Sequence, residues 1–162
     1  MNRRPFMAGN WKMFMDRGEA SELVKSLVEA VGDVKEVDIA VAPPFTALET
    51  VGRLIQGTNI SLASQNMFWE EKGAYTGEVA PHMLHDLGVR YAIIGHSERR
   101  QHFGESIENT ALKFKAALAA GLIPILCVGE RLEEREAGIT QSVVERQLMG
   151  GLEGLSADEI GE

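Results

Sequence analysis

The sequence contains 162 residues, 44% of them hydrophobic and 25% charged, so it is long enough to bury the core of one domain. Its formal net charge of −8 argues against nucleic acid as a partner, and no apolar run reaches the roughly 20 residues of a membrane helix. The single cysteine, Cys127, excludes an intrachain disulfide and fits a reducing cytoplasm.

Strand and helix patterns alternate along the chain. Short apolar runs that end in glycine, proline or polar residues indicate buried strands, whereas apolar residues at i, i+3, i+4 and i+7 indicate amphipathic helices. In chain order, these patterns predict a strand at 5–9, a helix at 20–31, a strand at 37–42, a helix at 48–55, a strand at 60–65, a short helix at 82–87, a strand at 91–94, a helix at 107–118, a strand at 123–128 and a helix at 139–148. This alternation predicts right-handed βαβ units and a parallel sheet.

Polar residues follow the first, third, fourth and fifth predicted strands. Because the carboxyl ends of parallel strands meet at one edge of the sheet, where ligands bind in such folds, we expect these residues to form a site. Lys12 follows the first strand and could hold an anionic group as a point charge, although an ordinary surface lysine is the alternative.

His96 follows Gly95 at the end of a fully apolar strand. Ser97 and Glu98 look like the first turn of a short helix, whose partial positive charge favours a neutral imidazole. A neutral His96 could donate a hydrogen bond to a carbonyl and act as an electrophile. The alternative is a strand-end residue that satisfies only its own hydrogen bonds. Glu98 and Arg99 could form an ion pair, but their spacing favours two solvated side chains.

Cys127 lies in the apolar run of the fifth predicted strand, which predicts a buried and unreactive thiol. The sequence contains neither a glycine-rich nucleotide motif nor a set of His, Cys and carboxylate residues with metal-ligand spacing. We therefore expect neither a cofactor nor a metal.

Five segments together resemble the triosephosphate isomerase family. They are AGNWKM at Ala8–Met13, ASQN at Ala63–Asn66, GAYTGE at Gly73–Glu78, IIGHSERR at Ile93–Arg100 and CVGE at Cys127–Glu130. Each segment is moderately specific, but all five occur in that family's order and spacing, from one end of this chain to the other.

The resemblance implies the (β/α)8 TIM-barrel fold and a cofactor-free isomerase of glycolysis and gluconeogenesis. Such an enzyme interconverts dihydroxyacetone phosphate and D-glyceraldehyde 3-phosphate by proton transfer through an enediol(ate). His96 would be the neutral catalytic electrophile, and Lys12 would bind the anionic substrate and stabilise developing charge. Asn10 would orient the substrate. The implied supporting residues are Glu98, Gln65 and Cys127. Of these, Glu98 would pair with Lys12.

The long segment 66–80 shows no helical pattern, and loops of this length are usually functional or bind a partner. The resemblance implies that 66–79 is the loop through which two copies form a homodimer. Thr76 would then reach the site of the partner subunit.

A complete barrel of this kind needs about 250 residues, whereas the pattern here contains about five β/α units. We therefore expect residues 1–162 to be the amino-terminal portion of a single TIM-barrel domain, an incomplete barrel with unpaired edges at strands one and five. The family's glutamate base, lid and phosphate loops match no segment, so we expect this chain to be nearly inactive on its own. The alternative is a non-catalytic partial barrel that acts as an association or folding module.

Overall fold

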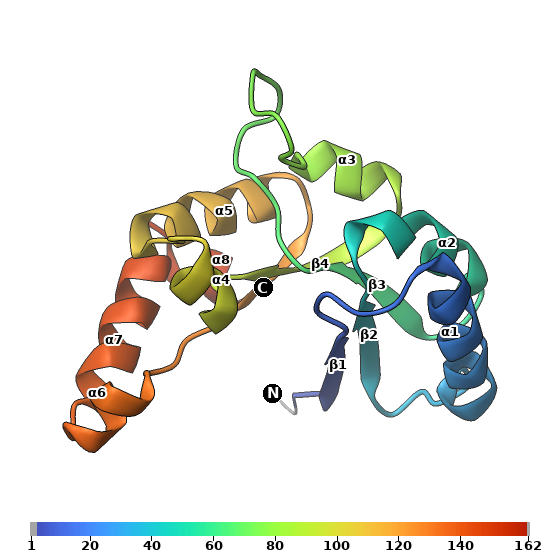
Figure 1. Ribbon diagram of the computed structural model, residues 1–162, viewed down its shortest axis with the longest axis horizontal. Helices are drawn as coiled ribbons and strands as arrows, with labels where there is room; N and C mark the ends of the chain where they lie inside the picture. The colour runs from blue at the N-terminus through green and yellow to red at the C-terminus, as the bar shows by residue number, and fades with distance from the viewer. Residues whose placement is uncertain (1–2, 162) are drawn as a thin grey trace.

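Five parallel strands form one curved sheet in the computed structural model, which describes residues 3–161. The strands are β1 (Phe6–Asn10), β2 (Asp38–Ala42), β3 (Ile60–Ser64), β4 (Val89–Ile94) and β5 (Ile123–Leu126), paired in this order. Helices cover the convex face, so the sheet has the shape of a half-barrel whose concave side is open between β1 and β5 (Figure 1). The predicted α/β class and incomplete-barrel architecture are confirmed for these residues.

The predicted helices are confirmed to within a few residues. The helices are α1 (Arg17–Val31), the 3-10 helix η1 (Phe45–Ala47), α2 (Leu48–Leu54), α3 (Pro81–Asp86), α4 (Ser97–His102), α5 (Ile107–Ala119), α6 (Leu132–Glu136), α7 (Thr140–Gly151) and α8 (Ala157–Gly161). The short elements η1, α6 and α8 were not predicted, because each is too short to show a helical repeat of apolar residues.

Helix α1 begins where a capping box satisfies its first free N–H groups. The Asp16 side chain accepts hydrogen bonds from the N–H groups of Gly18 and Glu19, at 2.8 and 2.9 Å. The Glu19 side chain in turn accepts from the Asp16 N–H at 2.9 Å. This reciprocal pair ends the irregular segment that follows β1, and it thereby sets the length of the loop that carries Lys12.

The fifth strand is shorter than predicted. It ends at Leu126 rather than Val128, so Cys127 lies just beyond it, although the Cys127 N–H still donates to the Ile94 carbonyl at 2.9 Å. The Gln147 side-chain amide bonds both the N–H and the C=O of Gly129, at 2.9 and 3.0 Å. This amide on α7 thereby satisfies the backbone groups of Gly129, which lies beyond the end of β5.

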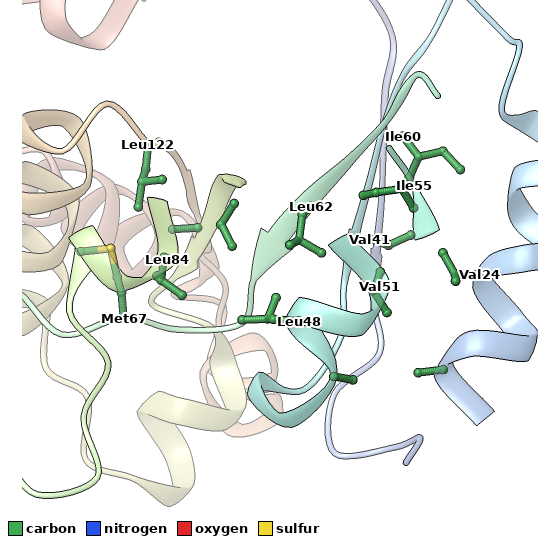
Figure 2. Close-up of a cluster of buried hydrophobic side chains, with 14 of the residues drawn as sticks. Val24, Val41, Leu48, Val51, Ile55, Ile60, Leu62, Met67, Leu84 and Leu122 are labelled. Carbon is green, nitrogen blue, oxygen red and sulfur yellow. The ribbon is translucent and has the colours of Figure 1, made fainter. Parts of the chain in front are cut away.

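The main hydrophobic core lies between the helices and the convex face of the sheet (Figure 2). It contains Val24 from α1, Val51 from α2, Leu84 from α3, and Val41, Leu62 and Ile94 from the strands. Successive residues of a strand point to opposite faces, so Val41 joins this core while its neighbours Ala40 and Ala42 face the concave side.

A second, smaller cluster lines the concave face. Its buried members are Ala40, Ala42, Ala63, Tyr91 and Ile93. The Phe6 ring on β1 packs against Tyr91 on β4, with 4.9 Å between the ring centroids. The small alanines of the intervening strands leave room for these two rings to meet, so side chains of the half-barrel cover part of its own interior.

Both edges of the sheet are unpaired within the described residues, as expected. Strand β1 pairs with β2 alone and β5 with β4 alone. Most of β1 is exposed, and Met7 on this strand is 65% exposed. Of the helices between residues 3 and 161, none combines the length and apolar character that crossing a membrane requires.

Candidate functional site

The polar residues that follow β1, β3 and β4 meet at one cavity of about 300 Å³. The cavity is lined by Asn10, Lys12, Met13, Pro44, Phe45, Gln65, Asn66, His96, Glu98, Arg99 and Phe103. The structure thus brings together five of the predicted site residues at the carboxyl ends of neighbouring strands. The polar turn after β5 is not among the lining residues, contrary to expectation. Glu130 in this turn pairs with Arg135 at 2.9 Å.

The backbone of Lys12 is held from two sides. The Asn10 side-chain oxygen accepts the Lys12 N–H at 2.9 Å, and the Gln65 side-chain amide donates to the Lys12 carbonyl at 2.8 Å. The same Gln65 nitrogen also donates to the Ala42 carbonyl at the end of β2, at 2.8 Å. These bonds hold Lys12 in a left-handed conformation with φ of +52°, which few residues other than glycine adopt.

The Lys12 ammonium points toward the turn that carries His96. Its Nζ atom donates to Glu98 Oε1 at 2.8 Å, so the two residues form an ion pair across the cavity. The hydrogen bond from Lys12 lowers the pKa of Glu98, which is therefore a carboxylate at neutral pH. Glu98 and Arg99 do not pair with each other, and the Glu98 side chain is 42% exposed, so the preference for two solvated side chains holds in part. Glu98 forms the pair with Lys12 that the resemblance implies, whereas Arg99 pairs with Glu105.

His96 is the N-cap residue of α4. Its Nδ1 atom accepts a hydrogen bond from the Glu98 N–H at 3.3 Å. A nitrogen that accepts cannot carry a proton, so the neutral ring is protonated at Nε2 and presents a donor there. Glu98 Oε2 lies 3.5 Å from the same Nδ1 and would favour a proton on it, but the backbone contact is the shorter of the two.

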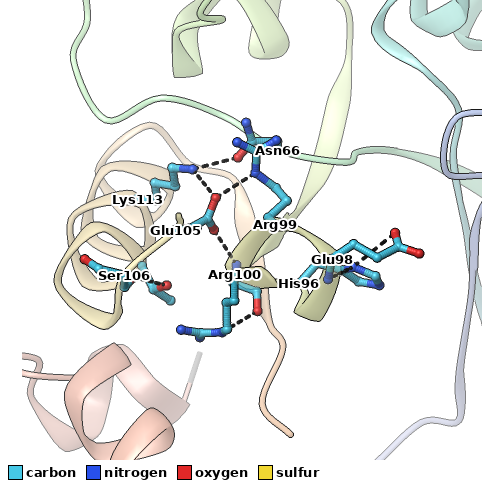
Figure 3. Close-up of polar contacts among 10 residues, drawn as sticks. Asn66, His96, Glu98, Arg99, Arg100, Glu105, Ser106 and Lys113 are labelled. Carbon is cyan, nitrogen blue, oxygen red and sulfur yellow. Dashed lines mark hydrogen bonds and ion pairs between the residues drawn. The ribbon is translucent and has the colours of Figure 1, made fainter. Parts of the chain in front are cut away.

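A buried ionic network lies directly behind His96 (Figure 3). The Glu105 carboxylate accepts hydrogen bonds from the Gly95 N–H at 2.9 Å, from Arg99 Nε at 2.7 Å and from Lys113 Nζ at 2.6 Å. Burial alone would raise the pKa of Glu105, but the hydrogen bonds from Lys113, Arg99 and a backbone N–H lower it below its ordinary value.

Sequence reasoning missed this network, although one signal was present. Lys113 occupies the buried face of α5 together with Thr110, Ala111, Phe114 and Ala117. A lysine in the apolar stripe of a helix needs a buried partner, because an unpaired charge is costly away from water. The partner Glu105 lies in the turn before α5, where the linear pattern does not mark it as buried.

Two predicted site residues lie outside the cavity. Thr76 is exposed in the long loop after β3, which projects from the molecule (Figure 1). Cys127 packs against the cluster of the concave face, and burial raises the pKa of its thiol. The thiol is consequently protonated at neutral pH and poorly nucleophilic. Between residues 3 and 161, no group of three or more His, Cys, Asp and Glu side chains is arranged to hold a metal ion.

Comparisons with known proteins identify relatives along almost the whole chain. A family profile described as triosephosphate isomerase matches residues 5–162. Triosephosphate isomerase from Citrifermentans bemidjiense is 55% identical over 157 residues, which are 97% of this chain and 62% of the relative. The enzyme of that name from Carboxydothermus hydrogenoformans is 54% identical with the same coverage.

A solved structure shares the arrangement of the strands and helices. The crystal structure of triosephosphate isomerase from Bartonella henselae superposes with a TM-score of 0.89 at 37% identity, over 97% of this chain and 65% of that one. The chain thus spans somewhat less than two thirds of the length of the relatives that it matches.

Proposed function

Because this chain belongs to the triosephosphate isomerase family, we propose that it serves the interconversion of dihydroxyacetone phosphate and D-glyceraldehyde 3-phosphate. The reaction belongs to glycolysis and gluconeogenesis in the cytoplasm and requires no cofactor. The observation that carries this proposal is that Lys12 and His96, from the ends of two different strands, converge on one cavity and both contact Glu98. Lys12 donates to the Glu98 carboxylate, and His96 accepts the Glu98 backbone N–H.

Each residue of the cavity has a chemical role in this proposal. The Lys12 ammonium binds the anionic substrate and stabilises the negative charge that develops when a proton leaves the carbon beside the carbonyl. The Nε2–H of His96 donates to the carbonyl oxygen and so stabilises the enediolate. Asn10 orients Lys12 and the substrate, and Gln65 holds the Lys12 peptide in place. His96 passes the proton of the adjacent hydroxyl to the former carbonyl oxygen. The general base returns the proton that it removed to the neighbouring carbon, which completes the isomerisation.

The proposed general base is a carboxylate other than Glu98. Among the described residues that line the cavity, Glu98 is the only acidic one, and the hydrogen bond from Lys12 lowers its pKa. A carboxylate with a lowered pKa is a weak base at neutral pH. Because general base catalysis contributes about 10²- to 10⁴-fold, residues 1–162 alone should turn over slowly.

Complementation tests this proposal. Isomerisation of D-glyceraldehyde 3-phosphate is measured for this chain alone, and after mixing with a polypeptide that covers the rest of the Citrifermentans bemidjiense relative. We expect the rate to rise by at least about 10²-fold on mixing. The Lys12→Met and His96→Gln variants should abolish this gain, whereas the matched control Lys25→Met on the exposed side of α1 should retain it.

Two results would contradict the proposal. Fast turnover by residues 1–162 alone would show that a base is already present in the cavity. A mixture that binds and folds but responds equally to Lys12→Met and Lys25→Met would show that Lys12 has no role in the reaction.

We also propose that the working form is a homodimer whose two subunits contact each other through residues 66–79. The base of this loop is ordered by a hydrogen bond from the Phe68 N–H to the Val79 carbonyl at 2.9 Å. The Phe68 and Tyr75 rings pack at a tilted angle with 4.7 Å between their centroids, so the adjoining segment with Thr76 is presented as a preformed surface.

The second candidate function is a non-catalytic association or folding module. Its support is the exposed β1 edge, because unpaired strands with apolar side chains promote association with other chains. The complementation experiment separates the candidates: a module would associate with the second polypeptide without any rise in isomerase activity.

A further inference from the structure

We propose that Glu105 and Lys113 are positioning residues that hold His96 and Lys12 in one fixed mutual geometry. They do so by joining the turn after β4 to the turn after β3 beneath the cavity. Neither side chain lines the cavity, so both act through other residues. The consequence for catalysis rests on the proposed function, whereas the consequence for the geometry of the site does not.

The first half of the connection fixes the His96 turn on both of its sides. Glu105 accepts the N–H of Gly95, the residue immediately before His96, and also Nε of Arg99, one turn into the helix that His96 caps. Gly95 has a φ of +73°, and a Cβ atom there would lie 3.0 Å from Thr110 Cγ2. The left-handed backbone and the crowding that a side chain would meet there therefore favour glycine at the residue before His96.

The second half of the connection leads to Lys12. Lys113 Nζ, which already donates to Glu105, donates to the Asn66 side-chain oxygen at 2.8 Å. Asn66 directly follows Gln65, whose amide holds the Lys12 carbonyl. One buried ammonium thus links the turn that orients the imidazole to the segment that holds the lysine backbone.

The position of this pair supports a geometric role. Both side chains are almost completely buried, at 5% and 2% exposure for Lys113 and Glu105. Buried ion pairs are often no more stabilising than apolar residues of the same size. Their hydrogen bonds are directional, however. Those that Glu105 accepts from Gly95 and Arg99 hold the His96 turn, and the one that Lys113 donates to Asn66 holds the segment after β3. Apolar replacements would fill the space but could not fix those segments relative to each other.

The test is the double variant Glu105→Gln/Lys113→Met, which removes both charges together and leaves neither one buried without its partner. The first readout is the ¹⁵N spectrum of the His96 imidazole in the free chain, which reports which ring nitrogen carries the proton. The wild type should show one tautomer with Nδ1 unprotonated, and the variant a mixture or exchange broadening. The matched control is Glu130→Gln/Arg135→Met, an ion pair beyond β5 that should leave the spectrum unchanged.

The second readout is the activity of the complemented enzyme. Loss of positioning should lower kcat at least tenfold with little change in KM, because the substrate anion still meets Lys12. A double variant that folds and shows the wild-type His96 spectrum overturns the inference, whatever its activity. If that variant does not fold, Lys113→Arg is measured instead; it keeps the charge but displaces the donors, and an unchanged spectrum again overturns the inference. An inactive complemented wild type would contradict the proposed function, while the spectra still decide the geometry.

Discussion

Lys12 shows how single side chains of the site depend on residues far from them in the chain. Its left-handed backbone costs about 1–3 kcal/mol for a residue other than glycine, and such strain persists where neighbouring bonds compensate for it. Here Asn10 and Gln65 supply those bonds, from β1 and from the end of β3. The left-handed backbone conformation and the ion pair with Glu98 together orient the ammonium toward the turn of His96.

The pairing of Lys12 with Glu98 predicts a titration effect. The Lys12→Met variant should raise the pKa of Glu98, because the hydrogen bond from Lys12 is the largest cause of its lowered value. Carboxyl ¹³C chemical shifts measured against pH in the free chain check this. The control Arg53→Met, on α2, should leave the Glu98 titration unchanged. If the pKa of Glu98 were the same with and without Lys12, the ion pair would not form in solution.

Short helices and turns, rather than the long helices, orient most of the functional groups of the site. Helix α4 is short, yet the Glu98 N–H in its first turn donates to the His96 ring and orients it. The turn before α5 supplies Glu105, and the Ser106 cap that follows begins α5, so that Lys113 faces the same network. The long loop after β3 carries Asn66 near its start and the exposed Thr76 nearer its end.

The role proposed for this loop leads to a prediction about self-association. Thr76→Arg should raise the dimer dissociation constant at least about tenfold, since a new charge at a buried contact costs more than 1.4 kcal/mol. Sedimentation velocity over a range of concentrations measures it. The control Glu29→Arg, at an exposed position of α1, should leave the dissociation constant unchanged. Association that is equally strong in both variants would point to the β1 edge instead of the loop.

The molecule as a whole has one complete core and one open face. The helices and the convex face bury the larger hydrophobic cluster, whereas the concave cluster is covered in part by Phe6 and Tyr91. The charged network is also part of the interior, so the stability of the fold should depend on the ionisation of Glu105. Its pKa in the folded chain is lowered from the ordinary value of 4.5.

The direction of this shift predicts how acid affects the fold. A carboxylate with a lowered folded-state pKa contributes stability above its unfolded-state value, and that contribution is lost as the pH falls through the folded-state value. Between about pH 5 and pH 3, the wild type should therefore lose on the order of 1 kcal/mol more stability than Glu105→Gln/Lys113→Met. Urea unfolding at several pH values measures this, with the exposed Glu136→Gln as control. If the free energy of unfolding changed equally with pH in all three proteins, the lowered pKa of Glu105 in the folded chain would be contradicted.

The strand and helix order followed from the sequence because apolar periodicity is a local property. Each strand is a short apolar run, and alternation of strands with helices restricts the chain to parallel pairing. Parallel pairing then brings the strand ends together, so Lys12 and His96 could be nominated for one site before any contact was known. The short elements α6 and α8 and the early end of β5 could not be predicted, because a few residues carry no periodic pattern.

Only the tertiary structure decided which side chains act together at that site, apart from the pair of Lys12 with Glu98, which the family resemblance already implied. Lys12 and Glu98 are 86 residues apart in the sequence, Gln65 and Lys12 are 53 apart, and Lys113 and Asn66 are 47 apart. Periodicity reports whether a position is buried, but it does not report what a buried charge faces. The place of Lys113 in an apolar stripe indicates that it needs a buried partner. Only the packing of α5 against the segment after β3 and the turn that precedes the helix identifies the partners as Asn66 and Glu105.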